Sequence, residues 1–117
     1  MKRIYVSGPI TKGNRSHNFY QATEAQRLLM EAGYAVLNPM LSMMHPDGHN
    51  IPWQLWIDSD LAWVECAHLI VRLPGESKGA DLECEHAMER GIPVMLPYMF
   101  PCLRDMFPDP NERAKAA

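Results

Sequence analysis

Short apolar runs alternate with longer amphipathic segments along most of the chain. The apolar runs predict strands at residues 2–7, 34–37, 68–73 and 92–96. Helical spacing of apolar residues predicts helices at residues 18–32, 52–66 and 79–90. This alternation predicts an α/β domain, a flavodoxin- or Rossmann-like three-layer sandwich whose parallel sheet has about four or five strands.

The length of 117 residues suits one hydrophobic core. We expect a single domain at residues 1–100, followed by a C-terminal tail at residues 101–117 that is partly ordered. Residues 38–52 are rich in turn-forming residues, so they are predicted to form a long surface loop.

Composition narrows the class of protein. Charged residues make up 21% of the chain, the net charge is −3, and no basic run is present, so a nucleic acid polymer is not an expected partner. No apolar run is long enough for a membrane span. The three cysteines have no CxxC spacing and are expected to be free thiols, which predicts a cytoplasmic protein.

In parallel α/β sheets, ligands bind beyond the carboxyl ends of the strands. In this chain those ends are predicted at residues 7–9, after Leu37, at residues 74–79 and after Leu96. The residues most able to do chemistry gather at these positions, so we expect the functional site there.

Glu83 stands out in the helix predicted at residues 79–90. Asp81, Glu85 and Glu89 are spaced by four and form one solvated stripe, but Glu83 lies off that stripe. Instead it is in line with the predicted packed face, which contains Ala80, Cys84, Ala87, Met88 and Gly91. Glu83 is therefore either an active-site carboxylate or a surface glutamate favoured near a helix N-terminus.

A second carboxylate interrupts the apolar face of the helix predicted at residues 52–66. That face contains Trp53, Trp56, Ile57, Asp60, Val64 and Ala67. A buried aspartate is costly unless it is paired or used, and its pKa rises if it stays unpaired. Asp60 is either a functional acid or an acid satisfied by backbone donors. The two tryptophans could stack on a base, although helical spacing is more typical of packing.

Other site types fit the sequence poorly. His45 and His49 lie in a predicted loop and lack the single-face spacing of a helical metal pair. Ser7 and Ser77 have no His-Asp arrangement, and the dinucleotide fingerprint GxGxxG is absent. Accordingly no metal and no cofactor are expected.

Four segments, taken in order, resemble a known superfamily. They are residues 4–10 (IYVSGPI), Asn38-Pro39, residues 60–63 (DLAW), and the pattern Ser77-x-Gly79-x-x-x-Glu83-x-x-x-Ala87. Their order and spacing are similar to the nucleoside 2-deoxyribosyltransferases and the 2′-deoxynucleoside 5′-phosphate N-hydrolases. The resemblance covers about residues 3–97, and residues 73–81 look like the short phage- or prophage-type members of uncertain activity.

The resemblance implies roles for individual residues. Glu83 would be the nucleophile that attacks the anomeric carbon, Asp60 the acid that assists departure of the base, and Tyr5 the residue that orients the nucleophile. The implied substrate-binding residues are Ser7, Gly8, Pro9, Asn38, Trp56, Ser77 and Gly79.

The implied function is cleavage or exchange of the N-glycosidic bond of a (deoxy)nucleoside or its monophosphate, by a homodimer or larger homo-oligomer. Pro9 and Thr11 stand where the N-hydrolases carry a phosphate-binding serine and arginine, so hydrolase and transferase both stay open. The alternative is a protein that senses or sequesters a nucleotide without turnover.

Overall fold

The computed structural model describes residues 1–44 and 48–112. Its strands are β1 (Arg3–Ser7), β2 (Ala35–Leu37), β3 (Leu69–Arg72) and β4 (Val94–Met95). Its α-helices are α1 (Arg15–Glu31), α2 (Trp53–Val64) and α3 (Lys78–Glu89). The order and type of these elements confirm the predicted alternation, with ends that shift by up to three residues. None of the helices within the described ranges is long and apolar enough to cross a membrane.

The strands form one parallel sheet in the order β2-β1-β3-β4. This arrangement confirms the predicted α/β fold class. From β1 the chain moves to one edge of the sheet, and from β3 it moves to the other. The carboxyl ends of the central pair therefore form the crevice at which such sheets bind ligands. Register places Ser7 beside Arg72 at that crevice.

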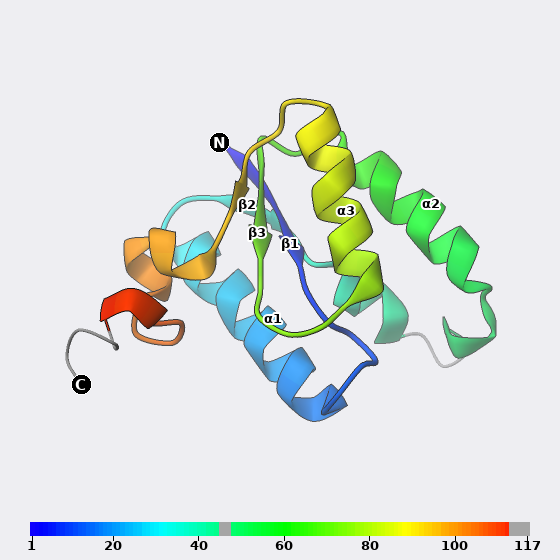
Figure 1. Ribbon diagram of the computed structural model, residues 1–117, viewed down its shortest axis with the longest axis horizontal. Helices are drawn as coiled ribbons and strands as arrows, with labels where there is room; N and C mark the ends of the chain where they lie inside the picture. The colour runs from blue at the N-terminus through cyan, green and yellow to red at the C-terminus, as the bar shows by residue number, and fades with distance from the viewer. Residues whose placement is uncertain (45–47, 113–117) are drawn as a thin grey trace.

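Helices cover both faces of the sheet (Figure 1). Helix α1 lies on one face, and α2 and α3 lie together on the other. Side chains of β1 alternate between these layers: Ile4 and Val6 join the core beneath α1, whereas Tyr5 joins a second core cluster with Val64 and Ala87. Since successive strand residues point to opposite faces, Ser7 points the same way as Tyr5, toward α3.

Helix α1 differs from the prediction in its start. It begins at Arg15, because the side chain of Asn14 accepts a hydrogen bond from the backbone N–H of His17 and caps the helix. Phe19 is exposed. The buried face contains Asn18, Gln21, Ala22, Ala25 and Leu29. In α3, Met88 and Gly91 are likewise exposed rather than packed.

Residues 38–52 contain more regular structure than the predicted surface loop. Two 3-10 helices occupy part of it, η1 (Pro39–Met44) and η2 (Gly48–Asn50). Asn38 initiates η1, since its Oδ1 accepts a hydrogen bond from the N–H of Met40 at 3.1 Å. The indole N–H of Trp56 donates to the carbonyl of Gly48 at 3.1 Å and ties η2 to α2.

The segment after β4 packs against α1. It contains the 3-10 helices η3 (Pro97–Met99) and η4 (Pro101–Leu103). Phe100 and Leu103 are buried in the same core cluster as Ile4 and Val6. This segment extends the cover on the α1 face of the sheet. All three cysteines are free thiols, as predicted.

Candidate active site

The carboxylate of Glu83 is buried at the crevice between β1 and β3. The residue is 5% exposed and lies on the inward face of α3, away from the acidic stripe. The hydroxyl of Tyr5 donates to Oε2 at 2.5 Å, and the hydroxyl of Ser7 donates to Oε1 at 2.8 Å. Both donors come from one face of β1, so the two-residue repeat of the strand places one hydroxyl group at each carboxylate oxygen.

The charge of Glu83 reflects two opposing effects. Burial raises its pKa, whereas the hydrogen bonds from Tyr5 and Ser7 favour the ionised form and oppose that rise. Burial and the nearby negative charge of Glu83 raise the pKa of Tyr5 far above its ordinary value. The phenol of Tyr5 therefore stays protonated and remains a donor.

Asp60 is a second carboxyl group at the same place. It is half-buried on α2 and lines the same cavity as Glu83. Burial, followed by the negative charge of Glu83, raises the pKa of Asp60 to about 7. This direction is the one expected for an acid on an apolar stripe. Near neutral pH, Asp60 can hold a proton beside the carboxylate of Glu83.

The cavity above Glu83 has a volume of about 250 Å³. That is slightly below the roughly 300–1,000 Å³ typical of small-molecule sites. Its wall combines indole rings with cations, since Lys78 Nζ lies 5.1 Å from the ring centroid of Trp53. The lining residues are Gly8, Ile10, Thr11, Lys12, Trp53, Trp56, Ile57, Asp60, Ser77, Lys78, Gly79, Ala80 and Glu83.

The start of α3 is shaped by two small residues. Ser77 is the N-cap, and its hydroxyl accepts a hydrogen bond from the N–H of Ala80 at 3.1 Å. A Cβ on Gly79 would lie 3.3 Å from Cδ1 of Ile57, so the glycine permits close packing of α3 on α2. These contacts place the first turn of α3 at the edge of the cavity.

Most of the residues predicted for the site meet there. Gly8, Trp56, Asp60, Ser77, Gly79 and Glu83 line the cavity. Tyr5 and Ser7 lie behind Glu83 as its hydrogen-bond donors. The structure does not bring Pro9 and Asn38 into the cavity. Pro9 is buried against Gly75, and the Asn38 side chain bonds the N–H of Met40 and the side chain of Gln26.

Two buried side-chain amides on α1, which the sequence pattern did not predict, hold the loops around the cavity. The side chain of Asn18 donates to the carbonyls of Ile10 at 3.2 Å and Lys12 at 2.7 Å. The side chain of Gln21 donates to the carbonyl of Pro74 at 3.2 Å. Asn18 and Gln21 are three residues apart and in line with Ala25, so the helical period could have placed them on the buried face. Polar residues in a helix are usually solvated, however, and are therefore not expected there.

A metal centre has no support among residues 1–44 and 48–112. No group of three or more histidine, cysteine, aspartate or glutamate residues there could hold a metal ion. Of the histidine pair considered from the sequence, His45 lies outside the described residues.

Solved structures that share this fold include an enzyme. One is a 2-deoxyribosyltransferase from the psychrotolerant bacterium Bacillus psychrosaccharolyticus, with a TM-score of 0.65, 20% identity, and coverage of 80% of this chain and 70% of that chain. Another is a conserved protein from Enterococcus faecalis V583, with a TM-score of 0.64, 22% identity, and coverage of 99% and 74%. At these identities the likeness shows the fold alone.

The amino-acid sequence matches a protein family, but it matches no protein of described activity. No curated protein matches this chain. A family model described as "Domain of unknown function (DUF4406)" matches residues 2–96, which is most of the chain. The chain therefore belongs to the DUF4406 family of domains of unknown function.

Proposed function

We propose that this protein cleaves or exchanges the N-glycosidic bond of a (deoxy)nucleoside or its monophosphate. The observation that carries the proposal is the pairing of two carboxyl groups in one cavity. Glu83 has both oxygens held by hydroxyl donors, and Asp60 has a pKa of about 7. Two carboxyl groups in different environments are the usual equipment for glycosidic bond cleavage.

The proposed reaction proceeds in two displacements. A carboxylate oxygen of Glu83 attacks the anomeric carbon while the bond from that carbon to the base nitrogen breaks. The bonding electron pair leaves with the base, and protonated Asp60 delivers a proton to the base. Water or a second base then attacks the anomeric carbon, Glu83 leaves as carboxylate, and Asp60 accepts the proton of the incoming group.

The cavity wall supports a nucleoside-sized ligand. Trp53 and Trp56 supply aromatic surface on which a base can stack. Lys12 and Lys78 also line the cavity, so a 5′-phosphate is compatible with it. A fold shared with a 2-deoxyribosyltransferase supports the same class of substrate.

The protein is further proposed to act as a homodimer in the cytoplasm. Four neighbouring residues on the outward side of α2 are exposed and uncharged, and we call them the outer strip: Leu55, Ser59, Ala62 and Trp63. An exposed and largely apolar strip of this kind favours a protein partner. Because α2 also carries Asp60, a second copy on this strip would lie close to the cavity.

The experiment is a substrate panel with matched variants. Deoxynucleosides, ribonucleosides and their monophosphates are incubated with the protein, with and without an acceptor base, and free or exchanged base is measured by chromatography. Glu83→Gln should abolish base release, because the amide cannot act as nucleophile. Glu85→Gln is the control, since Glu85 is an exposed residue of the same helix.

Three outcomes separate the alternatives. Base exchange selects a transferase, and base release without exchange selects a hydrolase. If neither occurs, and a nucleotide binds with equal affinity to wild type and Glu83→Gln, the protein is a nucleotide-binding protein without turnover. Equal base release by wild type and Glu83→Gln would refute the role of Glu83.

A further inference from the structure

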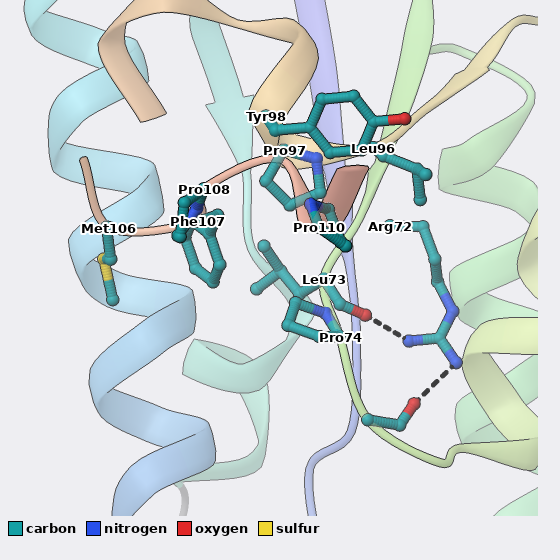
Figure 2. Close-up of a pocket in the computed structure, with 11 residues that line it drawn as sticks. Arg72, Leu73, Pro74, Leu96, Pro97, Tyr98, Met106, Phe107, Pro108 and Pro110 are labelled. Carbon is teal, nitrogen blue, oxygen red and sulfur yellow. Dashed lines mark hydrogen bonds between the residues drawn. The ribbon is translucent and has the colours of Figure 1, made fainter. Parts of the chain in front are cut away.

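A second and larger pocket lies at the carboxyl ends of β3 and β4. Its volume is about 540 Å³, and neither Glu83 nor Asp60 lines it. Figure 2 shows Arg72 and Leu96 on one side, Met106 and Phe107 on the other, and Leu73 and Pro74 between them. The lining residues are Arg72, Leu73, Pro74, Gly75, Leu96, Pro97, Tyr98, Met106, Phe107, Pro108 and Pro110.

The wall of this pocket is apolar and stiff. Four of its residues are prolines, at positions 74, 97, 108 and 110, and the ring of each restricts its own backbone. Leu73 and Pro97 are buried, and the phenyl ring of Phe107 packs against the core. A preformed apolar wall lowers the entropy that a ligand loses on binding, and it fits a flat hydrocarbon surface.

Arg72 brings a positive charge to the edge of this apolar pocket. Its side chain is only 15% exposed. The guanidinium donates from Nη1 to the carbonyl of Leu73 at 2.5 Å, and from Nη2 to the carbonyl of Gly75 at 2.9 Å and to Asp81 Oδ1 at 3.0 Å. These bonds hold the planar group in one orientation, and its Nε–H donates to no residue that the structure describes.

The charge of Arg72 is only partly compensated, since the buried carboxylate of Glu83 attracts it without a direct hydrogen bond. Its carboxylate partner, Asp81, has a side chain that is 72% exposed, so solvent screens the attraction. Within residues 1–44 and 48–112, no acidic side chain lines the pocket, and the other polar side chain in its wall is the phenol of Tyr98. A mostly buried cation beside an apolar cavity favours a ligand that brings one negative charge.

We propose that this pocket binds a small flat carboxylate, with its apolar rings against the proline and Phe107 walls and its carboxylate paired with Arg72. The site is separate from the Glu83 cavity and its ligand is a different class of molecule. A nucleobase fits less well, because its N–H donors would face a wall in which the phenol of Tyr98 is the one side-chain acceptor among the described lining residues.

The test compares two probes of nearly the same size and shape, of which only one is charged. 2-Naphthoate and the neutral 2-naphthamide are titrated into the full chain by calorimetry. Naphthoate should bind at least about tenfold more tightly than the amide, because its carboxylate forms charge-assisted hydrogen bonds with the guanidinium. Arg72→Met should remove this preference, whereas Lys78→Met, which removes a cation from the wall of the Glu83 cavity, should leave it unchanged.

The position of the bound probe is read from backbone amide shifts. Naphthoate should shift the amide signals of residues 72, 73, 75, 96, 98, 106 and 107, and it should leave those of residues 53–60 unchanged. Equal affinity for the two probes on wild type, no binding of either, or shifts centred on the Glu83 cavity would each overturn the proposal. If Arg72→Met does not fold, the affinities of wild type for 2-naphthoate and 2-naphthamide still test the proposal.

Discussion

At the residue scale, the site depends on two hydroxyl groups spaced by two along β1. Tyr5 and Ser7 each bond one oxygen of Glu83, and the period of the strand brings both to the same side. The buried carboxylate thus has polar partners that favour its charge, while burial opposes it. Removing either donor should change the chemistry of Glu83 more than it changes the fold.

Tyr5→Phe tests this relation. Loss of one donor should raise the pKa of Glu83 further, so the acidic limb of the activity profile should move to higher pH. We expect kcat/KM to fall by roughly ten- to a hundredfold, in keeping with a hydrogen bond to a charged group worth about 1.5–3 kcal/mol. The pH dependence of base release measures both effects. Tyr20→Phe, at an exposed tyrosine, should change neither.

Titration of Asp60 should also make the free energy of unfolding depend on pH. The folded protein holds this proton more tightly than the unfolded chain, with a pKa of about 7 against an ordinary value of 3.8. Wild type therefore loses stability as pH rises between these two values, and the loss is complete above pH 7. Asp60→Asn removes the titration, so its stability relative to wild type should be greater at pH 8 than at pH 4.

Urea denaturation at pH 4 and pH 8 measures the difference. Asp58→Asn is the matched control, since Asp58 is exposed on the same helix and bonds only Gln54 among the described residues. If the difference in unfolding free energy between Asp60→Asn and wild type is the same at pH 4 and pH 8, Asp60 titrates normally in the folded protein.

At the element scale, the N-terminus of α3 carries the site. Ser77 caps the helix, and the two turns that follow contain Gly79 and Glu83. Glu83 is therefore positioned by its helix as well as by β1. Where α3 begins also determines which N–H groups face the cavity.

Ser77→Ala should affect both stability and activity. Loss of the cap should lower the free energy of unfolding by about 1 kcal/mol. Asn14→Ala removes the corresponding cap of α1 and should produce a similar loss of stability. Only Ser77→Ala should also lower base release, because α3 carries Glu83 whereas α1 carries neither of the two carboxyl groups. Chemical denaturation and the base-release assay separate these effects, and equal activity losses would contradict a specific role of the α3 start.

At the scale of the whole molecule, α2 separates the Glu83 cavity from the outer strip. Ile57 and Asp60 lie on the inner face of α2. Leu55 lies on the opposite face and Trp63 on the side toward β2, and each is 57% exposed. In Figure 1, α2 lies at the periphery, covered by α3 on one side only. A second copy packed on this strip would bury apolar surface that is otherwise exposed.

Leu55→Glu tests the proposed dimer. A charge within the outer strip should shift the protein to the monomer in multi-angle light scattering, and base release should decrease with it. Met30→Glu is the control, because Met30 is 56% exposed on α1, on the other face of the sheet. A wild-type protein that is monomeric at high concentration would exclude this interface.

Local pattern was enough to predict the elements and part of the site. Strand runs, helical spacing and turn residues are short-range features, so they predicted the α/β order. The helical period of α3 separated Glu83 from Asp81, Glu85 and Glu89, and the apolar stripe of α2 singled out Asp60. The resemblance supplied proposed roles for these residues that the spacing alone did not contain.

Contacts distant in sequence were decided only by the tertiary structure. The order β2-β1-β3-β4 brings Tyr5 to Glu83, 78 positions along the chain, and gives Ser7 a place behind the carboxylate. The same packing buries Asn18 and Gln21 on α1, because loop carbonyls there require donors. Periodicity shows which face of an element is buried but not what it meets, since partners are determined by how the layers assemble.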